Sequence, residues 1–325
     1  MTDDDRTARK YQDVFNEILA NVEKVVKGKK DQVALALICV LAEGHLLLED
    51  VPGTGKTTLA KAISASIQGE MSRIQFTPDL LPSDVTGGLI YNQRSGDFEP
   101  HRGPIFANVV LADEINRASP KTQSAMLEVM EERQVTLGSL TEPVPRPFTV
   151  IATQNPVEQE GTYRLPEAQL DRFLIRTRLG YPDNADLISV MKGNGPRTQL
   201  DDLSAVTSVT DIGKMIGYSH SVHADDEIYD YIVRLVAETR PPTAPGVRLG
   251  ASPRGAIGLL RASQVLAASL GRTFVDVQDV KRLAGPVLAH RLILTPEAEF
   301  AGVDAEDLVE ELLAGVELPS MVNVG

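Results

Sequence analysis

The chain has 325 residues and a formal net charge of −13; 42% of its residues are hydrophobic and 24% are charged. This length indicates about two domains, with a core large enough to fold without disulfides or a structural metal. Cys39 is the single cysteine, which excludes an intrachain disulfide and a cysteine-rich zinc site. The acidic balance argues against a nucleic-acid partner, because duplex binding depends on clustered basic residues.

The N-terminal region has neither the pattern of an export signal nor that of a membrane anchor. Residues 1–10 are charged and contain no apolar segment. The longest apolar run, residues 33–42, is about half of the ~20 residues that a membrane span needs. We therefore expect a cytoplasmic protein without a membrane-spanning helix.

Hydrophobic periodicity predicts alternating helices and strands through the first half of the chain. Residues 12–27 and 31–42 have the spacing of helices, and residues 57–67 return to it. Short apolar runs predict buried strands at residues 45–48, 107–112, 148–153 and 173–177. Buried strands that alternate with helices indicate a parallel sheet covered on both faces.

Two segments interrupt this pattern, and the pattern itself changes near residue 182. Residues 77–100 are rich in Pro, Gly and Asp and predict loops and short elements, and residues 133–147 predict a hairpin that turns at Gly138 and Ser139. Beyond residue 182, helical patterns occur at residues 183–192, 208–217, 225–239, 253–269 and 276–291. We predict an α/β core over 1–182 that contains both inserts, and a small all-helical domain over 183–325.

A phosphate-binding loop is predicted between the first strand and the helix at residues 57–67. The segment reads Asp50-Val51-Pro52-Gly53-Thr54-Gly55-Lys56-Thr57-Thr58. Small residues let backbone N–H groups surround phosphate oxygens, and the helix N-terminus adds a favourable dipole. Lys56 is predicted to contact the β- and γ-phosphates, and the Thr57 hydroxyl is predicted to bind Mg²⁺. Asp50 replaces the first glycine of the motif, so we expect its carboxylate to point away from the phosphates.

An acidic pair follows the strand predicted at residues 107–112. Asp113 is predicted to hold Mg²⁺, and Glu114 is predicted to polarise the attacking water. Acidic residues in such a place also cap helices, but the upstream P-loop favours the catalytic interpretation. The two motifs together predict hydrolysis of ATP.

These motifs resemble those of the AAA+ ATPases, specifically the MoxR type. Besides the P-loop, the resemblance rests on the following segments: Ala112-Asp113-Glu114-Ile115-Asn116-Arg117-Ala118, Thr153-Gln154-Asn155-Pro156, Leu165-Pro166-Glu167-Ala168-Gln169-Leu170-Asp171-Arg172-Phe173 and Gly250-Ala251-Ser252-Pro253-Arg254. It extends from about residue 15 to residue 294. It implies a P-loop AAA+ core with a parallel sheet between helices, followed by a helical lid, with ATP and Mg²⁺ bound between them.

The resemblance also implies roles for single residues. Asn155 matches sensor 1, whose amide orients the water between Glu114 and the γ-phosphate. Arg172 matches the arginine finger, which a subunit offers to the γ-phosphate of its neighbour. An ion pair with Glu167 or Asp171 is the alternative role for Arg172.

Arg254 and two residues near the N-terminus complete the implied nucleotide site. Arg254 matches sensor 2; Ser252 is predicted to cap its helix, which places Arg254 in the first turn, where it reaches back to the phosphates. Val26 and Gly28 match the segment that lines the adenine.

The resemblance further implies a ring, most commonly a hexamer, that remodels or matures protein complexes, often with a partner that bears a von Willebrand A domain. Two alternatives remain: the ATPase subunit of a metal-chelatase-like complex, and a nucleic-acid motor. The roles of Arg117, His101 and Arg102 are left open.

Overall fold

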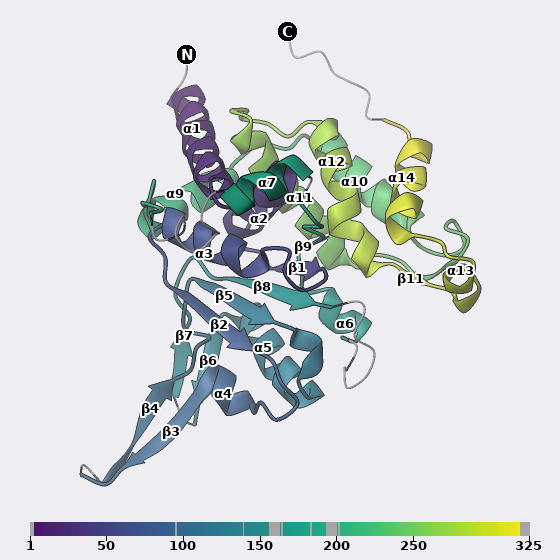
Figure 1. Ribbon diagram of the computed structural model, residues 1–325. Coiled ribbons are helices and arrows are strands. Elements are labelled where there is room, and N and C mark those ends of the chain that lie inside the picture. The colour runs from purple at the N-terminus through teal and green to yellow at the C-terminus, as the bar shows by residue number, and fades with distance from the viewer. Residues whose placement is uncertain are drawn as a thin grey trace.

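The computed structural model describes residues 3–94, 96–138, 140–155, 163, 165–182, 184–192, 200 and 202–318. They form an α/β core, built on a parallel sheet, and a mainly helical lid packed against it (Figure 1). This architecture confirms the fold class predicted from the sequence.

Five parallel strands form the central sheet, in the order β2-β5-β8-β1-β9. The strands are β1 (Leu46–Glu49), β2 (Met71–Gln75), β5 (Val109–Asp113), β8 (Thr149–Gln154) and β9 (Ile175–Thr177). Four of them were predicted. The edge strand β2 was missed because Ile74 is its single buried residue, so no apolar run marks it.

Alternating side chains of the strands supply two hydrophobic clusters, one on each face of the sheet. In β1, Leu46 and Leu48 belong to one cluster and Leu47 to the other. In β5, Leu111 and Val110 divide in the same way. Since both faces are buried, the strands read as continuous apolar runs in the sequence.

Helices cover both faces of the sheet. Residues of α1 (Asp3–Glu23), α2 (Lys30–Leu41) and α3 (Lys56–Ser66) contribute to the first cluster. The second cluster is covered by α5 (Pro120–Glu132), a helix that we did not predict. Two short helices, η1 (Ile115–Arg117) and α6 (Glu167–Leu170), lie in connections of the core.

Both predicted inserts contain β-hairpins. After the short helix α4 (Pro82–Thr86), β3 (Gly87–Asn92) and β4 (Asp97–Arg102) form a hairpin that protrudes from the core (Figure 1). Strands β6 (Gln134–Leu137) and β7 (Leu140–Pro143) form the hairpin predicted within residues 133–147. Of its predicted turn, Gly138 has a positive φ of 64°, and Ser139 lies outside the described residues.

All five helices predicted in the lid are present, with small shifts of their ends. The lid contains α7 (Asn184–Lys192), α9 (Val209–Ser219), α10 (Asp226–Glu238), α11 (Pro253–Ser269), α12 (Val277–Leu288), η2 (Ala289–Arg291), α13 (Pro296–Phe300) and α14 (Ala305–Gly315). It is not wholly helical, because β10 (Val247–Leu249) pairs antiparallel with β11 (Ile293–Leu294). Strands of three and two residues are too short to leave a pattern in the sequence.

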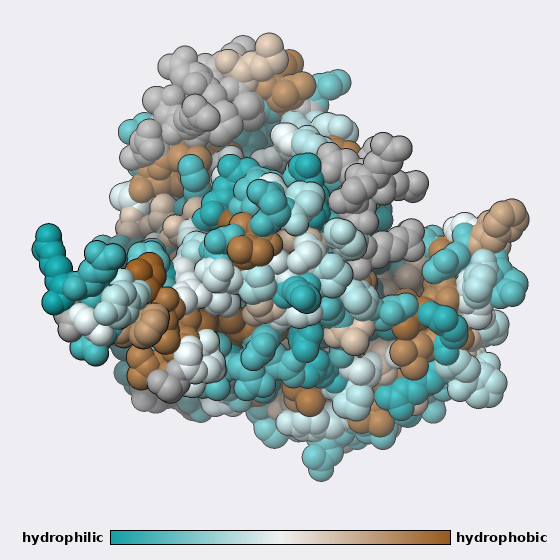
Figure 2. Space-filling model, turned by 90° about the horizontal axis from the view of Figure 1, so that it is seen from below, coloured by the Kyte–Doolittle hydropathy of each residue, from teal (hydrophilic) through white to brown (hydrophobic). Residues whose placement is uncertain are grey.

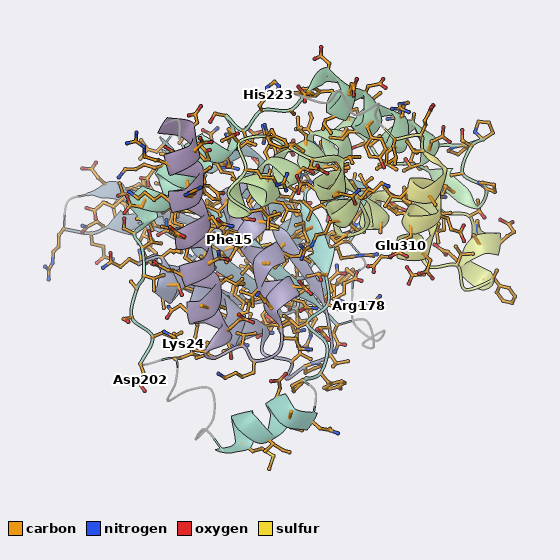
Figure 3. The ribbon with its side chains drawn as sticks, turned by 90° about the horizontal axis from the view of Figure 1, so that it is seen from above. Phe15, Lys24, Arg178, Asp202, His223 and Glu310 are labelled. Carbon is orange, nitrogen blue, oxygen red and sulfur yellow. The ribbon has the colours of Figure 1, made fainter. Side chains whose placement is uncertain are left out.

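The lid packs on the α1 and α2 side of the core. Helix α11 contacts both of these helices, and α12 contacts β9. Seen from above, α1, marked by Phe15, runs alongside the lid helices (Figure 3). The first hydrophobic cluster continues from the core into the lid, so the two regions bury apolar surface together. Within the part of the chain described, no helix is both long and apolar enough to cross a membrane.

Candidate functional site

The P-loop connects β1 to α3 and has the backbone shape of an anion-binding loop. Gly53 and Gly55 have φ values of +86° and +96°, which favour glycine. A Cβ at either position would meet nothing within 4 Å, so backbone conformation, not crowding, requires glycine. Pro52, Gly53 and Thr54 complete the turn, and Lys56, Thr57 and Thr58 form the first turn of α3. The loop therefore directs N–H groups and a helix N-terminus toward one space.

Lys56 is nearly buried, at 9% exposure, and its Nζ donates to the backbone O of Asp50 at 2.7 Å. Burial lowers the pKa of Lys56, while the charges of Asp113, Asp50 and Glu114 act in the opposite direction. The lysine is thus close enough to the acidic pair to interact with it. The Asp50 carboxylate accepts a hydrogen bond from Gly180 N at 2.7 Å and ties the P-loop to the segment after β9.

The acidic pair lies where three neighbouring strands end. Asp113 accepts from Thr153 Oγ1 at 2.7 Å and pairs with Arg73 Nη2 at 2.7 Å. Glu114 N donates to the same threonine hydroxyl at 2.8 Å. Glu114 has a φ of +56°, a strained value for a residue with a Cβ. Strained backbone of this kind concentrates at functional sites.

The Glu114 carboxylate is held by two further side chains. Its Oε2 accepts from Gln75 Nε2 at 3.0 Å and from Arg117 Nη1 at 2.9 Å. Asn155 follows the last residue of β8 and is 6% exposed. Because the carboxyl ends of parallel strands meet at one edge, the P-loop, the acidic pair and Asn155 lie together there.

The segment expected to line the adenine lies beside this edge. Val26 is buried, and Gly28 has a φ of +67°. The positive φ favours glycine at this position, and a Cβ on Gly28 would lie 1.7 Å from Oδ2 of Asp186 on α7, so that side chain would have to move. Lys29 Nζ donates to Tyr181 O at 2.8 Å, which links this segment to the residues that follow β9.

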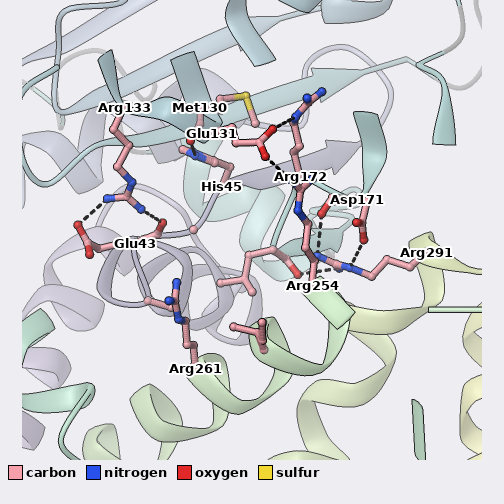
Figure 4. Close-up of a pocket in the computed structure, with 15 residues that line it drawn as sticks. Glu43, His45, Met130, Glu131, Arg133, Asp171, Arg172, Arg254, Arg261 and Arg291 are labelled. Atoms are coloured by element: carbon pink, nitrogen blue, oxygen red, sulfur yellow. Dashed lines mark hydrogen bonds and ion pairs between the residues drawn. The ribbon is translucent and has the colours of Figure 1, made fainter. Parts of the chain in front are cut away.

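Arg172 and Arg254 lie elsewhere, at the amino end of β1. Both pair with Glu131 at the end of α5: Arg172 Nε lies 2.8 Å from Oε2, and Arg254 Nη2 contacts Oε1 (Figure 4). The hydrogen bond from Arg172, with the charge of Arg254, lowers the pKa of the Glu131 carboxyl. The arginines line a hollow of about 280 Å³ that also includes residues 42–45, which precede β1.

This placement corrects the prediction for Arg254 and the alternative considered for Arg172. Arg254 does not reach the P-loop of its own chain, because α11 begins beside Arg172 and the P-loop follows the opposite end of β1. Arg172 is not paired with Glu167 or Asp171; its partner is Glu131. The prediction that Ser252 caps α11 is confirmed, since its Oγ accepts from Arg254 N at 3.1 Å.

Known proteins are similar to this chain in sequence and in fold. Residues 45–175 match the ATPase family associated with various cellular activities (AAA), and residues 242–312 match the AAA lid domain. The chain is 41% identical over 310 residues to the chaperone MoxR1 of Mycobacterium tuberculosis, which covers 92% of this chain and 81% of that protein. The chain belongs to the MoxR-type AAA+ ATPases.

Two further proteins are similar to this MoxR-type chain over nearly its full length. The uncharacterized protein YeaC of Bacillus subtilis is 48% identical over 316 residues, which are 95% of this chain and 97% of YeaC. The crystal structure of a protein from Cytophaga hutchinsonii, proposed to be an ATPase, matches with a TM-score of 0.90 at 40% identity. That match covers 97% of this chain and 98% of the other.

Several residues of the MoxR-type site belong to no sequence motif and were not predicted. Gln75 belongs to the unpredicted strand β2, and Glu131 belongs to the unpredicted helix α5. Of the residues left open, Arg117 pairs with Glu114 within the chain. Arg102 pairs with Glu142 at 2.7 Å and so links the two hairpins. His101, its neighbour on β4, is exposed.

Proposed function

We propose that this MoxR-type ATPase hydrolyses MgATP at the interfaces between neighbouring subunits of a ring. One observation carries the proposal: the residues predicted to act on the γ-phosphate are divided between two ends of β1. Lys56, Asp113 and Glu114 lie at the carboxyl end, whereas Arg172 and Arg254 lie at the amino end. Each subunit therefore supplies its P-loop half to its own nucleotide and its arginine half to the nucleotide of a neighbour.

The P-loop half fits Mg²⁺ with ATP. Magnesium is commonly held by one or two carboxylates together with substrate phosphates. Asp113 offers one carboxylate beside Lys56, and Thr57 offers a hydroxyl in the first turn of α3. No group of three or more His, Cys, Asp or Glu side chains that could form an all-protein metal cage occurs among residues whose placement is described. When bound, the cation neutralises charge on the phosphates.

In this proposal the residues of the P-loop half hold phosphate and activate water. Lys56 binds the β- and γ-phosphates, the glycine-rich turn surrounds their oxygens, and Glu114 takes the proton of the attacking water. Asn155 orients that water. Val26 and Gly28 line the adenine, next to the segment that Asp50 ties to the P-loop.

The arginine half supplies positive charge to the neighbour's nucleotide. Arg172 and Arg254 already converge on one anion, the Glu131 carboxylate, and the neighbour's γ-phosphate would take its place. An arginine offered in trans is worth ~10³–10⁵ in rate where it has been measured. Because Arg254 stands beside Arg172, we assign both to the neighbouring subunit's site.

We further propose that the ring is a hexamer that remodels protein complexes in the cytoplasm, with a partner bearing a von Willebrand A domain. The name of the relative MoxR1, a chaperone, supports a protein client. The protruding hairpin exposes Ile90, Tyr91 and Phe98, and Leu140 is exposed on the second hairpin. Figure 2 shows apolar residues gathered at this end of the molecule, as a surface for protein clients requires.

Mixing two inactive variants tests the proposal. Glu114→Gln removes the base and leaves the arginines, whereas Arg172→Ala removes an arginine and leaves the base. Random rings of the two contain intact sites at about a quarter of their interfaces, so ATPase activity returns on mixing. If the mixture stays as inactive as its components, the division of the site between subunits is wrong.

A further inference from the structure

A partly buried contact beside the arginine pair joins the core to the lid. Asp171 directly precedes Arg172, and its two carboxylate oxygens lie 2.9 and 3.1 Å from Ser252 Oγ. Ser252 caps the helix that carries Arg254. The Asp171 carboxylate also accepts from Arg291 Nε, on η2 of the lid, at 3.0 Å. One carboxylate is therefore bonded to both lid segments that flank the arginine pair.

Every N–H group of Arg291 has an acceptor. Nε donates to the Asp171 carboxylate, Nη1 to the carbonyls of Leu174 and Val287, and Nη2 to the carbonyls of Asp171 and Phe173. A guanidinium has five such donors in a fixed planar arrangement, which a lysine cannot reproduce. Four of these five bonds hold the short segment that contains Arg172.

The Arg291 side chain is 4% exposed, so these bonds are formed away from water. Burial lowers the pKa of Arg291 to about 10, and the charge of Asp171 opposes that change. The guanidinium is therefore charged at neutral pH, and Asp171 balances its charge. Removing Asp171 would leave the buried charge of Arg291 unpaired, which is costly.

Two glycines let α11 approach this contact closely. A Cβ on Gly255 would lie 3.1 Å from Cδ of Arg291, and one on Gly258 would lie 3.0 Å from Cδ1 of Leu174. The first turns of α11 are thus packed directly on Arg291 and on the segment after Arg172 (Figure 4). On this side of the molecule, close packing and hydrogen bonds join the lid to the core.

We propose that Asp171, Ser252 and Arg291 are positioning residues, which hold Arg172 and Arg254 at one fixed spacing so that both reach the same γ-phosphate of the neighbouring subunit. This inference rests on the proposed role of the two arginines in trans. Two guanidiniums can bind one phosphate only if their separation is set, and a misplacement of about 1 Å can cost ~10²-fold in rate. The bonds through Asp171 set that separation between a core residue and a lid residue.

Two variants and a control test the positioning. Arg291→Lys keeps the charge but loses the planar donors, and Ser252→Ala cuts the bond between Asp171 and α11. We expect each to lower ATPase turnover roughly 10- to 100-fold while the affinity for a fluorescent ATP analogue stays unchanged. The control is Arg272→Lys, which alters another arginine paired with a buried aspartate, Asp279, inside the lid. It should keep its turnover.

Mixing experiments distinguish positioning from general damage. Glu114→Gln protein, whose arginines are intact, should restore turnover to Arg291→Lys and Ser252→Ala rings. Arg172→Ala protein should not, because neither component then offers a complete arginine pair. Equal restoration by both partners would place the defect elsewhere and overturn the inference.

Turnover of the single variants also distinguishes a failure of the positioning from a failure of the role of Arg172. If Arg172→Ala is inactive but Arg291→Lys and Ser252→Ala are as active as the control, the positioning is wrong, and mixing Arg172→Ala with Glu114→Gln protein decides the trans role separately. If Arg172→Ala itself keeps its turnover, the trans role fails. Should Arg291→Lys not fold, as judged by circular dichroism, Ser252→Ala decides: unchanged turnover overturns the inference, and a selective loss supports it.

Discussion

The two ends of β1 present different chemical groups. At the carboxyl end, strand termini and a glycine-rich turn bring together backbone N–H groups, hydroxyls and the carboxylates of Asp113 and Glu114. At the amino end, arginines from the core and from the lid are balanced by the acidic residues Glu131 and Asp171. In the proposed function, one end binds a phosphate with its cation, and the other binds a phosphate of the neighbouring subunit's nucleotide.

The difference shows how each half depends on the fold. The phosphate-binding part of the carboxyl end depends on the core, because parallel strands bring their ends to one edge beside the P-loop and α3. The amino end needs the lid to dock, since Arg254 reaches Arg172 only through the packing of α11 on the core. A change that disturbs only the docking of α11 should therefore spare nucleotide binding and impair hydrolysis.

The largest predicted effect lies at the amino end. Arg172→Ala should lower ATPase turnover by ~10³–10⁵, the range found for arginines offered in trans, because the charge on the transferring phosphoryl group is no longer stabilised. Binding of a fluorescent ATP analogue should be unaffected, since the P-loop is at the other end of β1. If nucleotide binding weakened as much as turnover fell, the two ends of β1 would not have the separate roles proposed here.

A buried titratable residue at the amino end should make the stability of the folded chain depend on pH. His45 immediately precedes β1; its Nδ1 accepts from Val150 N at 3.0 Å, so its Nε2 carries the proton and donates to Met130 O at 3.0 Å. Burial lowers the pKa of His45 from 6.5 to about 4. Below pH 6.5 the unfolded chain binds a proton that the folded chain does not. The free energy of unfolding should therefore fall by up to about 3 kcal/mol as the pH drops from 6.5 toward 4.

Denaturant unfolding at pH 7 and pH 4.5 measures this effect. His45→Gln can form the same two hydrogen bonds without titrating, so the difference in unfolding free energy between the two pH values should shrink in that variant. An identical pH dependence in both proteins would show that His45 does not contribute. His290, whose pKa burial also lowers, remains in both proteins and cancels in the comparison.

The smallest predicted effect concerns the turn at the carboxyl end. Gly53→Ala places a Cβ on a backbone with a φ of +86°, which costs ~1–2 kcal/mol even though the space around it is open. Gly213→Ala is the matched control: it lies in α9, also in open space, and should stabilise the protein by roughly 0.5–1 kcal/mol. Thermal melting measures both, and equal shifts in the same direction would show that backbone conformation is not the cause.

The sequence was most informative where chemistry is local. Strands β1, β5 and β8 are buried on both faces, so they form apolar runs that could be predicted. The P-loop could also be predicted, because its residues are contiguous in the sequence. Strand β2 was not predicted, because it has only one buried side chain. The position of Arg254 depends on how α11 docks, and no spacing along the chain records that docking. Glu131 lacks a motif altogether, because its importance comes from two arginines that are distant in sequence.

Pairwise mixing that involves Arg254 tests the divided site most directly. If Arg254 acts in trans, Arg254→Ala protein should regain ATPase activity on mixing with Glu114→Gln protein. It should regain none with Arg172→Ala protein, because no subunit then carries both arginines. The reverse pattern, restoration by Arg172→Ala and none by Glu114→Gln, would show that Arg254 serves the nucleotide of its own chain and would contradict the account.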